Sequence, residues 1–224
     1  MRHVEPSATP AFAPPRPVRG PLLLVDIGGY TAFLQAVAYA HKDDAFADGN
    51  VPDAYAMVSS LLDGIVGRMV PPFSLAKLEG DAVFVYATDL GDIPRGSAFL
   101  AALRRCHDDF VARLGEAGVR WVCQCDACAR ISSLDIKFIV HAGPYVIQAI
   151  AGREELSGPD VVLAHRLLKS RAAEVVGHGA FALVTDAACS ALEVPTDLAT
   201  PIVEQYDHYP PVPAHVFAVH DLAG

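Results

Sequence analysis

The sequence predicts a single α+β domain built on a mixed, mostly antiparallel sheet with helices on one face. The chain has 224 residues, of which 52% are hydrophobic and 19% charged, so it can bury a sizeable core and is not generally disordered. Pairs of short apolar strands alternate with amphipathic helices, a pattern typical of this class. Residues 1–20 are rich in Pro and Ala and are expected to form a flexible arm. We therefore assign the domain to residues 21–224.

The first half of the domain has the pattern of a strand, two helices and a hairpin. A short apolar run ends at Gly28-Gly29, as a buried strand does when it leaves the core. Apolar residues then recur at helical spacing until Pro71-Pro72 ends the second helix. Glu79-Gly80-Asp81 has the composition of a tight hairpin turn. The expected elements are a strand at 22–27, helices at 30–42 and 53–69, and strands at 73–79 and 82–87.

The second half continues with helices that separate further strand pairs. Pro159 suits the first turn of a helix, and Ala142-Gly143-Pro144 is expected to form a turn between two strands. The sequence order is therefore β-α-α-β-β-α-β-β-α-β, followed by trailing elements. The expected elements are a helix at 97–118, a cysteine-containing loop, strands at 134–140 and 145–151, a helix at 159–175, a strand at 181–184, a helix at 186–192, and a last hairpin of 202–206 and 215–219.

Charge and composition argue against several classes of partner. The net charge is −9 and the basic residues are scattered, so neither nucleic acid nor an anionic membrane is an expected partner. No run of about 18 apolar residues predicts a membrane span, and the N-terminus lacks the apolar core of a signal peptide. Three of the five cysteines lie between Cys123 and Cys128, which suggests reduced thiols or a metal site. We expect a cytoplasmic protein.

Two aspartates are candidates for a divalent metal site. Asp26 lies near the end of the first strand and Asp81 at the tip of the hairpin. If these strands are neighbours, the two carboxylates converge at one rim of the sheet and offer the hard oxygen ligands that Mg²⁺ prefers. Gly28 and Gly29 would let a phosphate approach the backbone there. Each aspartate taken alone is also explained as a helix cap or a turn former.

The cysteine loop is a candidate zinc site. Cys123, Cys125 and Cys128 provide three soft ligands, and the fourth would come from Cys106, His107 or His141. Reduced thiols in a tight loop, or a redox-sensitive disulfide, explain the same residues. The remaining histidines show no ligand spacing and are mostly expected at the surface. They are His41, His178, His208, His215 and His220.

Several motifs resemble those of the class III nucleotidyl cyclases, over about residues 21–185. Leu23-Leu-Val-Asp-Ile-Gly-Gly-Tyr-Thr-Ala-Phe33 is similar to the opening strand and helix of that family. Lys77-Leu-Glu-Gly-Asp81 is similar to its hairpin, and Ile139-Val-His-Ala-Gly-Pro-Tyr145 to the strand turn that follows. The segment from Gly158 to Leu167 resembles a later helix of the family. The resemblance implies a ferredoxin-like βαββαβ core of the nucleotide cyclase type.

A bacterial branch of that superfamily, of uncharacterised function, resembles the chain more closely. Its members carry a Cys-x-Cys-x2-Cys loop, a Leu-x-Leu-Lys-Phe strand and a Val-x-x-x-His-Arg-Leu-Leu-Lys helix. The matching segments here are Cys123-Gln-Cys-Asp-Ala-Cys128, Leu134-Asp-Ile-Lys-Phe138 and Val162-Leu-Ala-His-Arg-Leu-Leu-Lys169.

The resemblance to cyclases implies roles for individual residues. Asp26 and Asp81, helped by the Ile27 carbonyl, would hold two Mg²⁺ or Mn²⁺ ions that orient a nucleoside triphosphate. Lys77 would contribute to recognition of the base, and Arg166 would stabilise developing charge on the phosphates. The active site of the family lies between two subunits, which implies a homodimer.

Two positions depart from the cyclase pattern. The ribose-orienting asparagine of the family corresponds to Val162, and the base-reading residue falls near Glu155, in a shortened loop of residues 152–156. His165 is a candidate replacement donor, or else a histidine packed on a helix face. These departures leave three hypotheses: a metal-dependent cyclase with an altered pocket, a non-catalytic cyclase-homology dimer that regulates or scaffolds, and a zinc-stabilised interaction protein.

Overall fold

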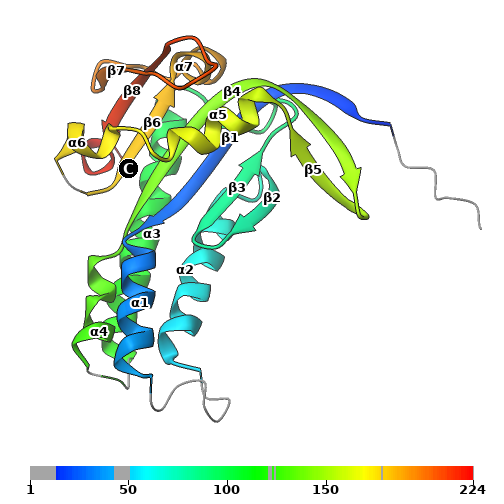
Figure 1. The fold of residues 1–224 in the computed structure, drawn as a ribbon. Coiled ribbons are helices and arrows are strands. Elements are labelled where there is room, and N and C mark those ends of the chain that lie inside the picture. The colour runs from blue at the N-terminus through cyan, green and yellow to red at the C-terminus, as the bar shows by residue number, and fades with distance from the viewer. Residues whose placement is uncertain (1–13, 43–50, 121–122, 124, 178, 224) are drawn as a thin grey trace, which may run out of the picture.

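The computed structural model describes residues 14–42, 51–120, 123, 125–177 and 179–223 (Figure 1). None of the helices in these ranges is both long and apolar enough to cross a membrane. The strands are β1 (Arg16–Gly28), β2 (Ser74–Glu79), β3 (Ala82–Tyr86), β4 (Asp135–Ile150), β5 (Arg153–Ser157), β6 (Phe181–Thr185), β7 (Thr200–Glu204) and β8 (Val212–Ala218). The helices are α1 (Tyr30–Ala40), α2 (Asp53–Met69), α3 (Ser97–Arg120), α4 (Asp126–Ala129), α5 (Pro159–Leu167), α6 (Ala172–Val176) and α7 (Asp186–Leu192), with 3₁₀ turns η1 (Arg130–Ser133) and η2 (Val219–Asp221).

The strands form one eight-stranded sheet, and the predicted α+β class is confirmed. Seven strands follow the order β2-β3-β1-β4-β6-β8-β7, and β5 pairs with β4. The β4–β6 pair is parallel, whereas the other pairs are antiparallel. β1 and β4 therefore lie at the centre of the sheet, with the β2–β3 hairpin on one side.

Helices cover both faces of the sheet, so the prediction of helices on one face was wrong. Alternate residues of a strand point to opposite faces, and β1 packs accordingly: Leu23 and Val25 join the core formed with α1, α2, α3 and α7, whereas Leu22 and Leu24 join the core formed with α5 and α6. All four side chains are fully buried. Strands buried on both faces read as continuous apolar runs, as residues 22–25 do, but such a run does not reveal whether helices or a second sheet cover each face.

A single long strand replaces the strand pair expected over residues 134–151. β4 continues through Ala142-Gly143-Pro144 because β1 pairs with it from Arg16 opposite Ile147 to Gly28 opposite Asp135. The chain turns after Ile150 instead, where Ala151 and Gly152 both have positive φ, of 51° and 76°. Two consecutive strands do follow α3, as expected, but they are β4 and β5 and not two halves of residues 134–151.

Other boundaries also differ from the expectation. β1 begins at Arg16, inside the predicted N-terminal arm, because residues 16–20 pair with β4; residues 1–13 lie outside the described residues. The helix expected over 159–175 ends at Leu167, and α6 follows as a separate helix. The cysteine loop contains the short helix α4 and the turn η1.

Candidate metal centres

Asp26 and Asp81 lie at the same end of two neighbouring strands. Asp26 is opposite Ala82 in the antiparallel β1–β3 pair, directly beside Asp81 in the hairpin turn. The N–H of Ile27 donates to the Asp81 carbonyl oxygen at 3.1 Å, which ties the turn to β1. The Ile27 side chain is buried in the core, so its contribution to this rim is limited to its backbone. β1 and β3 are therefore neighbours in the sheet, which is the condition on which the two-aspartate prediction depends.

The local electrostatics couple the two carboxylates. Burial, and then the negative charge of Asp26, raise the pKa of Asp81 above its ordinary value. Burial and the charge of Asp81 also raise the pKa of the Tyr30 hydroxyl, which places the start of α1 beside the same rim. A cation bound between Asp26 and Asp81 would relieve the repulsion between them.

Lys137 is a rim residue that the sequence reasoning missed. It lies opposite Asp26 in the β1–β4 pair, and its Nζ is 2.8 Å from Asp26 Oδ2. The Asp26 side chain is 13% exposed, so this ion pair partly neutralises a carboxylate with little access to water. A signal was available, because Lys137 is the lysine of the Leu134–Phe138 segment that resembles the bacterial branch.

Gly28 and Gly29 connect the rim to the first helix. Gly28 ends β1 opposite Asp135, and Gly29 precedes α1 with φ of +83°, a conformation that favours glycine. The Gly29 carbonyl accepts from the N–H of Phe33 at 3.0 Å, which starts the helix. The chain thus turns sharply immediately after Asp26.

Lys77, Glu79 and His165 form a polar group across the β2–β3 hairpin and α5. Lys77 Nζ lies 2.6 Å from Glu79 Oε1, and His165 Nε2 lies 2.8 Å from Glu79 Oε2. Burial opposes ionisation of Glu79, but the hydrogen bond from Lys77 and the charge of His165 outweigh it and lower its pKa. His165 Nδ1 is also 2.8 Å from the Val161 carbonyl oxygen. Both ring nitrogens therefore lie within hydrogen-bonding distance of an oxygen atom.

Arg166 contacts the segment between β7 and β8. Its Nη1 donates to the Asp207 carbonyl oxygen at 3.1 Å, and its guanidinium lies 5.4 Å from the centre of the Tyr209 ring. The Tyr209 hydroxyl donates in turn to the Pro159 carbonyl oxygen at 2.8 Å. The intrachain contacts described for Arg166 therefore hold it on the β7–β8 segment.

The two departures from the cyclase pattern also have defined positions. Glu155 lies in β5 opposite Gln148, so the expected short loop is a strand, because β4 extends far enough to pair with it. Val162 is on α5 and its side chain is 48% exposed, which makes it a surface valine without a polar group.

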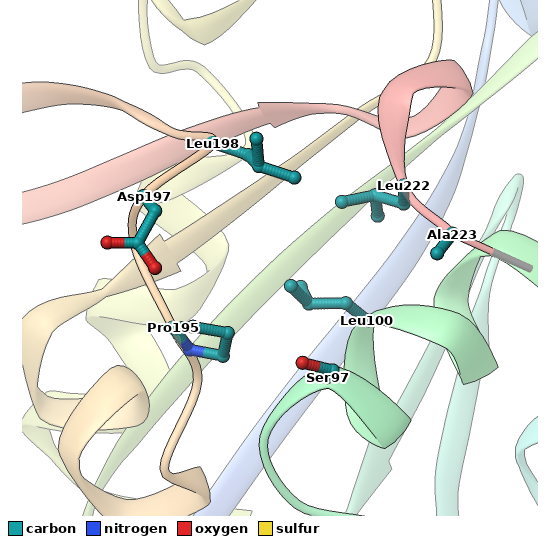
Figure 2. Close-up of a pocket in the computed structure, with 7 residues that line it drawn as sticks. All are labelled: Ser97, Leu100, Pro195, Asp197, Leu198, Leu222 and Ala223. Atoms are coloured by element: carbon teal, nitrogen blue, oxygen red, sulfur yellow. The ribbon is translucent and has the colours of Figure 1, made fainter.

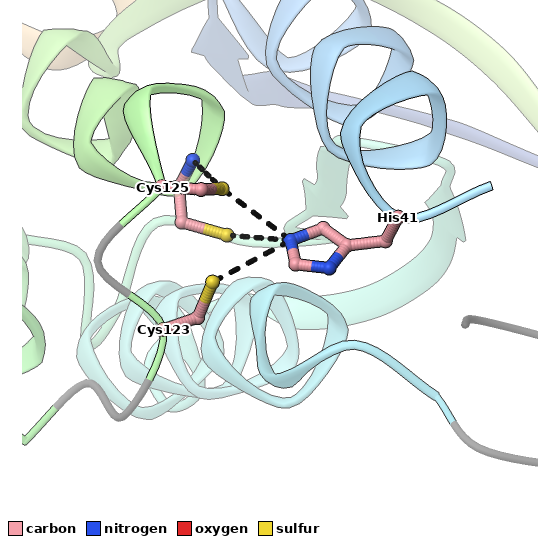
Figure 3. Close-up of side chains that lie close together, drawn as sticks. His41, Cys123 and Cys125 are labelled. Carbon is pink, nitrogen blue, oxygen red and sulfur yellow. Dashed lines mark hydrogen bonds between the residues drawn. The ribbon is translucent and has the colours of Figure 1, made fainter. Parts of the chain in front are cut away.

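A second cluster lies at the far end of α1 and comprises His41, Cys123, Cys125 and Cys128. Their ligand atoms all lie within 4.8 Å of one another, and Cys128 is buried. His41 Nε2 is 3.6 Å from Cys123 Sγ, and 3.4 Å from the Sγ atoms of both Cys125 and Cys128 (Figure 3). All three cysteines are free thiols. A hydrogen bond from the Cys128 N–H holds the pKa of Cys125 at about 6, whereas burial and the neighbouring thiols raise that of Cys128 to about 12.

The fourth member of this cluster is His41, and not one of the three residues that the sequence suggested. His107 lies between Asp108 and Asp135, with a different ring nitrogen 3.6 Å from a carboxylate oxygen of each. His141 is buried between Thr185 Oγ1 at 2.9 Å and Asp160 Oδ1 at 2.8 Å. Cys106 is buried in the core.

The sequence shows no ligand spacing for His41 because 82 positions separate it from Cys123, and only the packing of α1 beside α4 brings them together.

An open pocket of about 230 Å³ lies between the start of α3 and the C-terminal segment (Figure 2). Its walls are mostly apolar, and its one charged lining residue is Asp197. None of the predicted site residues lines it. The lining residues are Ser97, Leu100, Pro195, Asp197, Leu198, Leu222 and Ala223.

Residues 58–175 match the family model described as a protein of unknown function, DUF2652. The chain belongs to this family. It is also 30% identical over 181 residues to the uncharacterized protein Rv2561/Rv2562 of Mycobacterium tuberculosis (strain ATCC 25618 / H37Rv), an alignment that covers 72% of this chain and 78% of that protein. The DUF2652 match includes Asp81 and the three clustered cysteines, whereas Asp26 and His41 precede it.

Solved structures similar to this DUF2652 chain include nucleotide cyclase domains. The adenylyl cyclase CyaB from P. aeruginosa has a TM-score of 0.63 at 14% identity and covers 95% of this chain and 100% of its own. The guanylyl cyclase Cya2 has a TM-score of 0.55 at 15% identity, over 92% of this chain and 93% of its own. The guanylate cyclase domain of RhGC from Catenaria anguillulae, in complex with GTP, has a TM-score of 0.55 at 12% identity, over 90% and 97%. At these identities the likeness shows that the fold is that of the cyclase domains.

Proposed function

We propose that this DUF2652 protein is a cyclase-homology protein that binds a nucleoside triphosphate through a divalent metal site at Asp26 and Asp81. The observation that carries the proposal is the β1–β3 register, which puts Asp26 opposite Ala82 and so beside Asp81. The raised pKa of Asp81 supports it, because two coupled carboxylates attract a divalent cation. We further propose that the protein acts in the cytoplasm, in keeping with its free thiols, and as a homodimer, as the likeness to cyclases implies.

The residues around the rim suit this role. Mg²⁺ or Mn²⁺ ions at Asp26 and Asp81, with the Ile27 carbonyl, would orient the triphosphate. Metal binding at Asp26 competes with Lys137, whose ammonium now lies 2.8 Å from that carboxylate. Once released, Lys137 would be a cation available to a phosphate. Gly28 and Gly29 leave the backbone beside the rim accessible, since neither carries a side chain.

The nucleotide-contacting residues favour weak or divergent cyclase activity. Lys77, the base-recognition candidate, is paired with Glu79, which also accepts from His165. Val162 cannot supply the hydrogen bond that the asparagine of the family makes, and losing one such contact costs about 10²–10³ in rate. His165 and Arg166 remain the proposed donors toward the phosphates, and Glu155 a proposed base contact.

The same observations favour a second candidate, a non-catalytic regulatory or scaffold dimer. In that case the Lys77–Glu79–His165 group is a permanent contact between the hairpin and α5, and the metal centre of the cysteine loop stabilises the fold. The two candidates differ in whether a triphosphate binds at all.

Thermal unfolding with Mn²⁺ and each nucleoside triphosphate tests the proposal. A ligand at 100 times its dissociation constant adds about 2.7 kcal/mol to the free energy of unfolding, which raises the melting temperature by several degrees. The rise should disappear in Asp26→Asn and Asp81→Asn and persist in Asp63→Asn, a control that removes an exposed carboxylate on α2. If no triphosphate stabilises the wild-type protein, nucleotide binding is rejected.

A variant of Lys137 separates metal binding from phosphate binding. Lys137→Met leaves Asp26 without its cation, so Mn²⁺ alone should bind more tightly than to the wild type, while the triphosphate should bind more weakly. Mass detection of cyclic products from all four triphosphates then decides between the two candidates. Product that persists in both aspartate variants would contradict the metal role.

A further inference from the structure

We propose that His41, Cys123, Cys125 and Cys128 bind one zinc ion in a closed tetrahedral site, with His41 Nε2 as the fourth ligand. The site is separate from the Asp26–Asp81 rim, so the zinc proposal does not depend on whether the proposed nucleotide site is correct. The two lie at opposite ends of α1, which has 11 residues and is therefore about 16 Å long.

The distances match those of a tetrahedral zinc site. Zinc lies about 2.3 Å from thiolate sulfur and about 2.0–2.1 Å from imidazole nitrogen, so tetrahedral angles give about 3.6 Å between nitrogen and sulfur. The three observed Nε2–Sγ distances are 3.4, 3.4 and 3.6 Å. Three cysteines and one histidine are also one of the ligand sets that structural zinc sites use.

Hydrogen bonding does not explain three sulfurs around one imidazole nitrogen. Nε2 either carries one hydrogen or offers one lone pair, so it makes one such bond at a time. Two of the three contacts would then be close approaches without a bond. A metal ion at the centre would account for all three contacts, because each ligand atom would bond to the ion.

The centre would connect two chain segments that also meet at the sheet. β1 leads through Gly29 into α1, and His41 follows the last residue of that helix. The cysteine loop leads through α4 and η1 into β4. The β1–β4 pairing joins these segments at one end, with Gly28 opposite Asp135. Zinc would join them at the other end, where α1 packs beside α4 (Figure 1). Four protein ligands leave no open position, so the role is structural.

Metal analysis and X-ray absorption of the unmodified protein test the proposal without requiring a variant to fold. Protein purified without chelator should contain one zinc per chain. The absorption spectrum should fit three sulfur atoms at about 2.3 Å and one nitrogen at about 2.0–2.1 Å. Folded protein without zinc, iron in place of zinc, a disulfide among the three cysteines, or a shell of two or four sulfurs would each overturn the proposal.

Matched variants identify the histidine. His41→Ala should lose most of its zinc, whereas His41→Cys should keep one zinc per chain with a fourth sulfur in the shell. His107→Gln and Cys106→Ala, at two positions that the sequence also suggested, should retain zinc. If His107→Gln or Cys106→Ala loses zinc while His41→Ala keeps it, His41 is not the ligand.

Discussion

Asp26 and Asp81 show how single residues at the end of a strand pair acquire their properties from neighbours. The antiparallel register brings two negative charges together, and Lys137 on the opposite neighbouring strand compensates one of them. Among the described residues Asp81 makes no ion pair. Burial and the charge of Asp26 raise the pKa of Asp81 by more than the charge of Lys137 lowers it, so the net shift is upward.

The coupling predicts how Asp81 titrates. In Asp26→Asn its pKa should fall but stay above the ordinary value, because burial persists. Carboxyl carbon NMR through a pH titration measures this directly. Since the folded-state pKa is raised, the stability that protonated Asp81 contributes is present at low pH and lost as the pH rises through that pKa. Metal affinity should instead rise as the pH rises through the same pKa, because the metal binds the ionised carboxylate. An unchanged titration in Asp26→Asn would show that the two groups are not coupled.

At the scale of elements, β1 is constrained along its length by strands on both sides. Near its start the strand passes close to the end of β3: Ala87 N–H donates to the Pro21 carbonyl oxygen at 3.1 Å. The Ala87 carbonyl also accepts from the buried Tyr145 hydroxyl at 2.9 Å. A Cβ atom on Gly20 would collide with that same carbonyl oxygen. Glycine at this position permits the close packing.

Gly20→Ala should therefore destabilise the protein by about 3 kcal/mol, because backbone atoms have to move to admit one methyl group. Urea unfolding measures the change. Gly67→Ala is the matched control, since Gly67 is exposed in the interior of α2 and a Cβ there meets nothing within 4 Å. It should stabilise by about 0.5–1 kcal/mol through helix propensity. A loss in Gly67→Ala as large as that in Gly20→Ala would refute the steric explanation.

At the scale of the whole molecule, the sheet and the ends of the helices are held by different means. Both faces of the sheet are covered by buried apolar side chains. α1 and α4 instead lie side by side away from the sheet (Figure 1), and the His41–cysteine cluster lies between them. We expect these two regions to respond differently when the proposed zinc ion is removed.

Chelation should loosen the helix ends and leave the sheet intact. Hydrogen exchange after treatment with a zinc chelator should accelerate in the last turn of α1 and in residues 125–133, since these segments lose their shared anchor. The central pairing of β1 with β4 should remain protected. Cys106→Ala should respond as the wild type does, because Cys106 lies outside the cluster. Equal acceleration throughout the chain would contradict a local role for the metal.

Elements with a strong periodic pattern were predictable from the sequence. The helix at 53–69 matches α2, and the two strands around Glu79-Gly80-Asp81 match β2 and β3 within a residue or two, because apolar spacing and turn residues report local structure. Gly143-Pro144 was misleading for the opposite reason. Its local turn preference is overridden by pairing with β1, which comes from far away in the chain.

The sequence by itself determined the α+β class, the order of most elements, and the three cysteines and two aspartates as candidate ligands. These depend on short-range pattern and on the chemistry of side chains. Only the tertiary structure decided that helices cover both faces, that Lys137 pairs with Asp26, and that His41 completes the cysteine cluster. Each of these depends on which distant segments become neighbours. That is set by strand register and helix packing, neither of which leaves a periodic signal in the sequence.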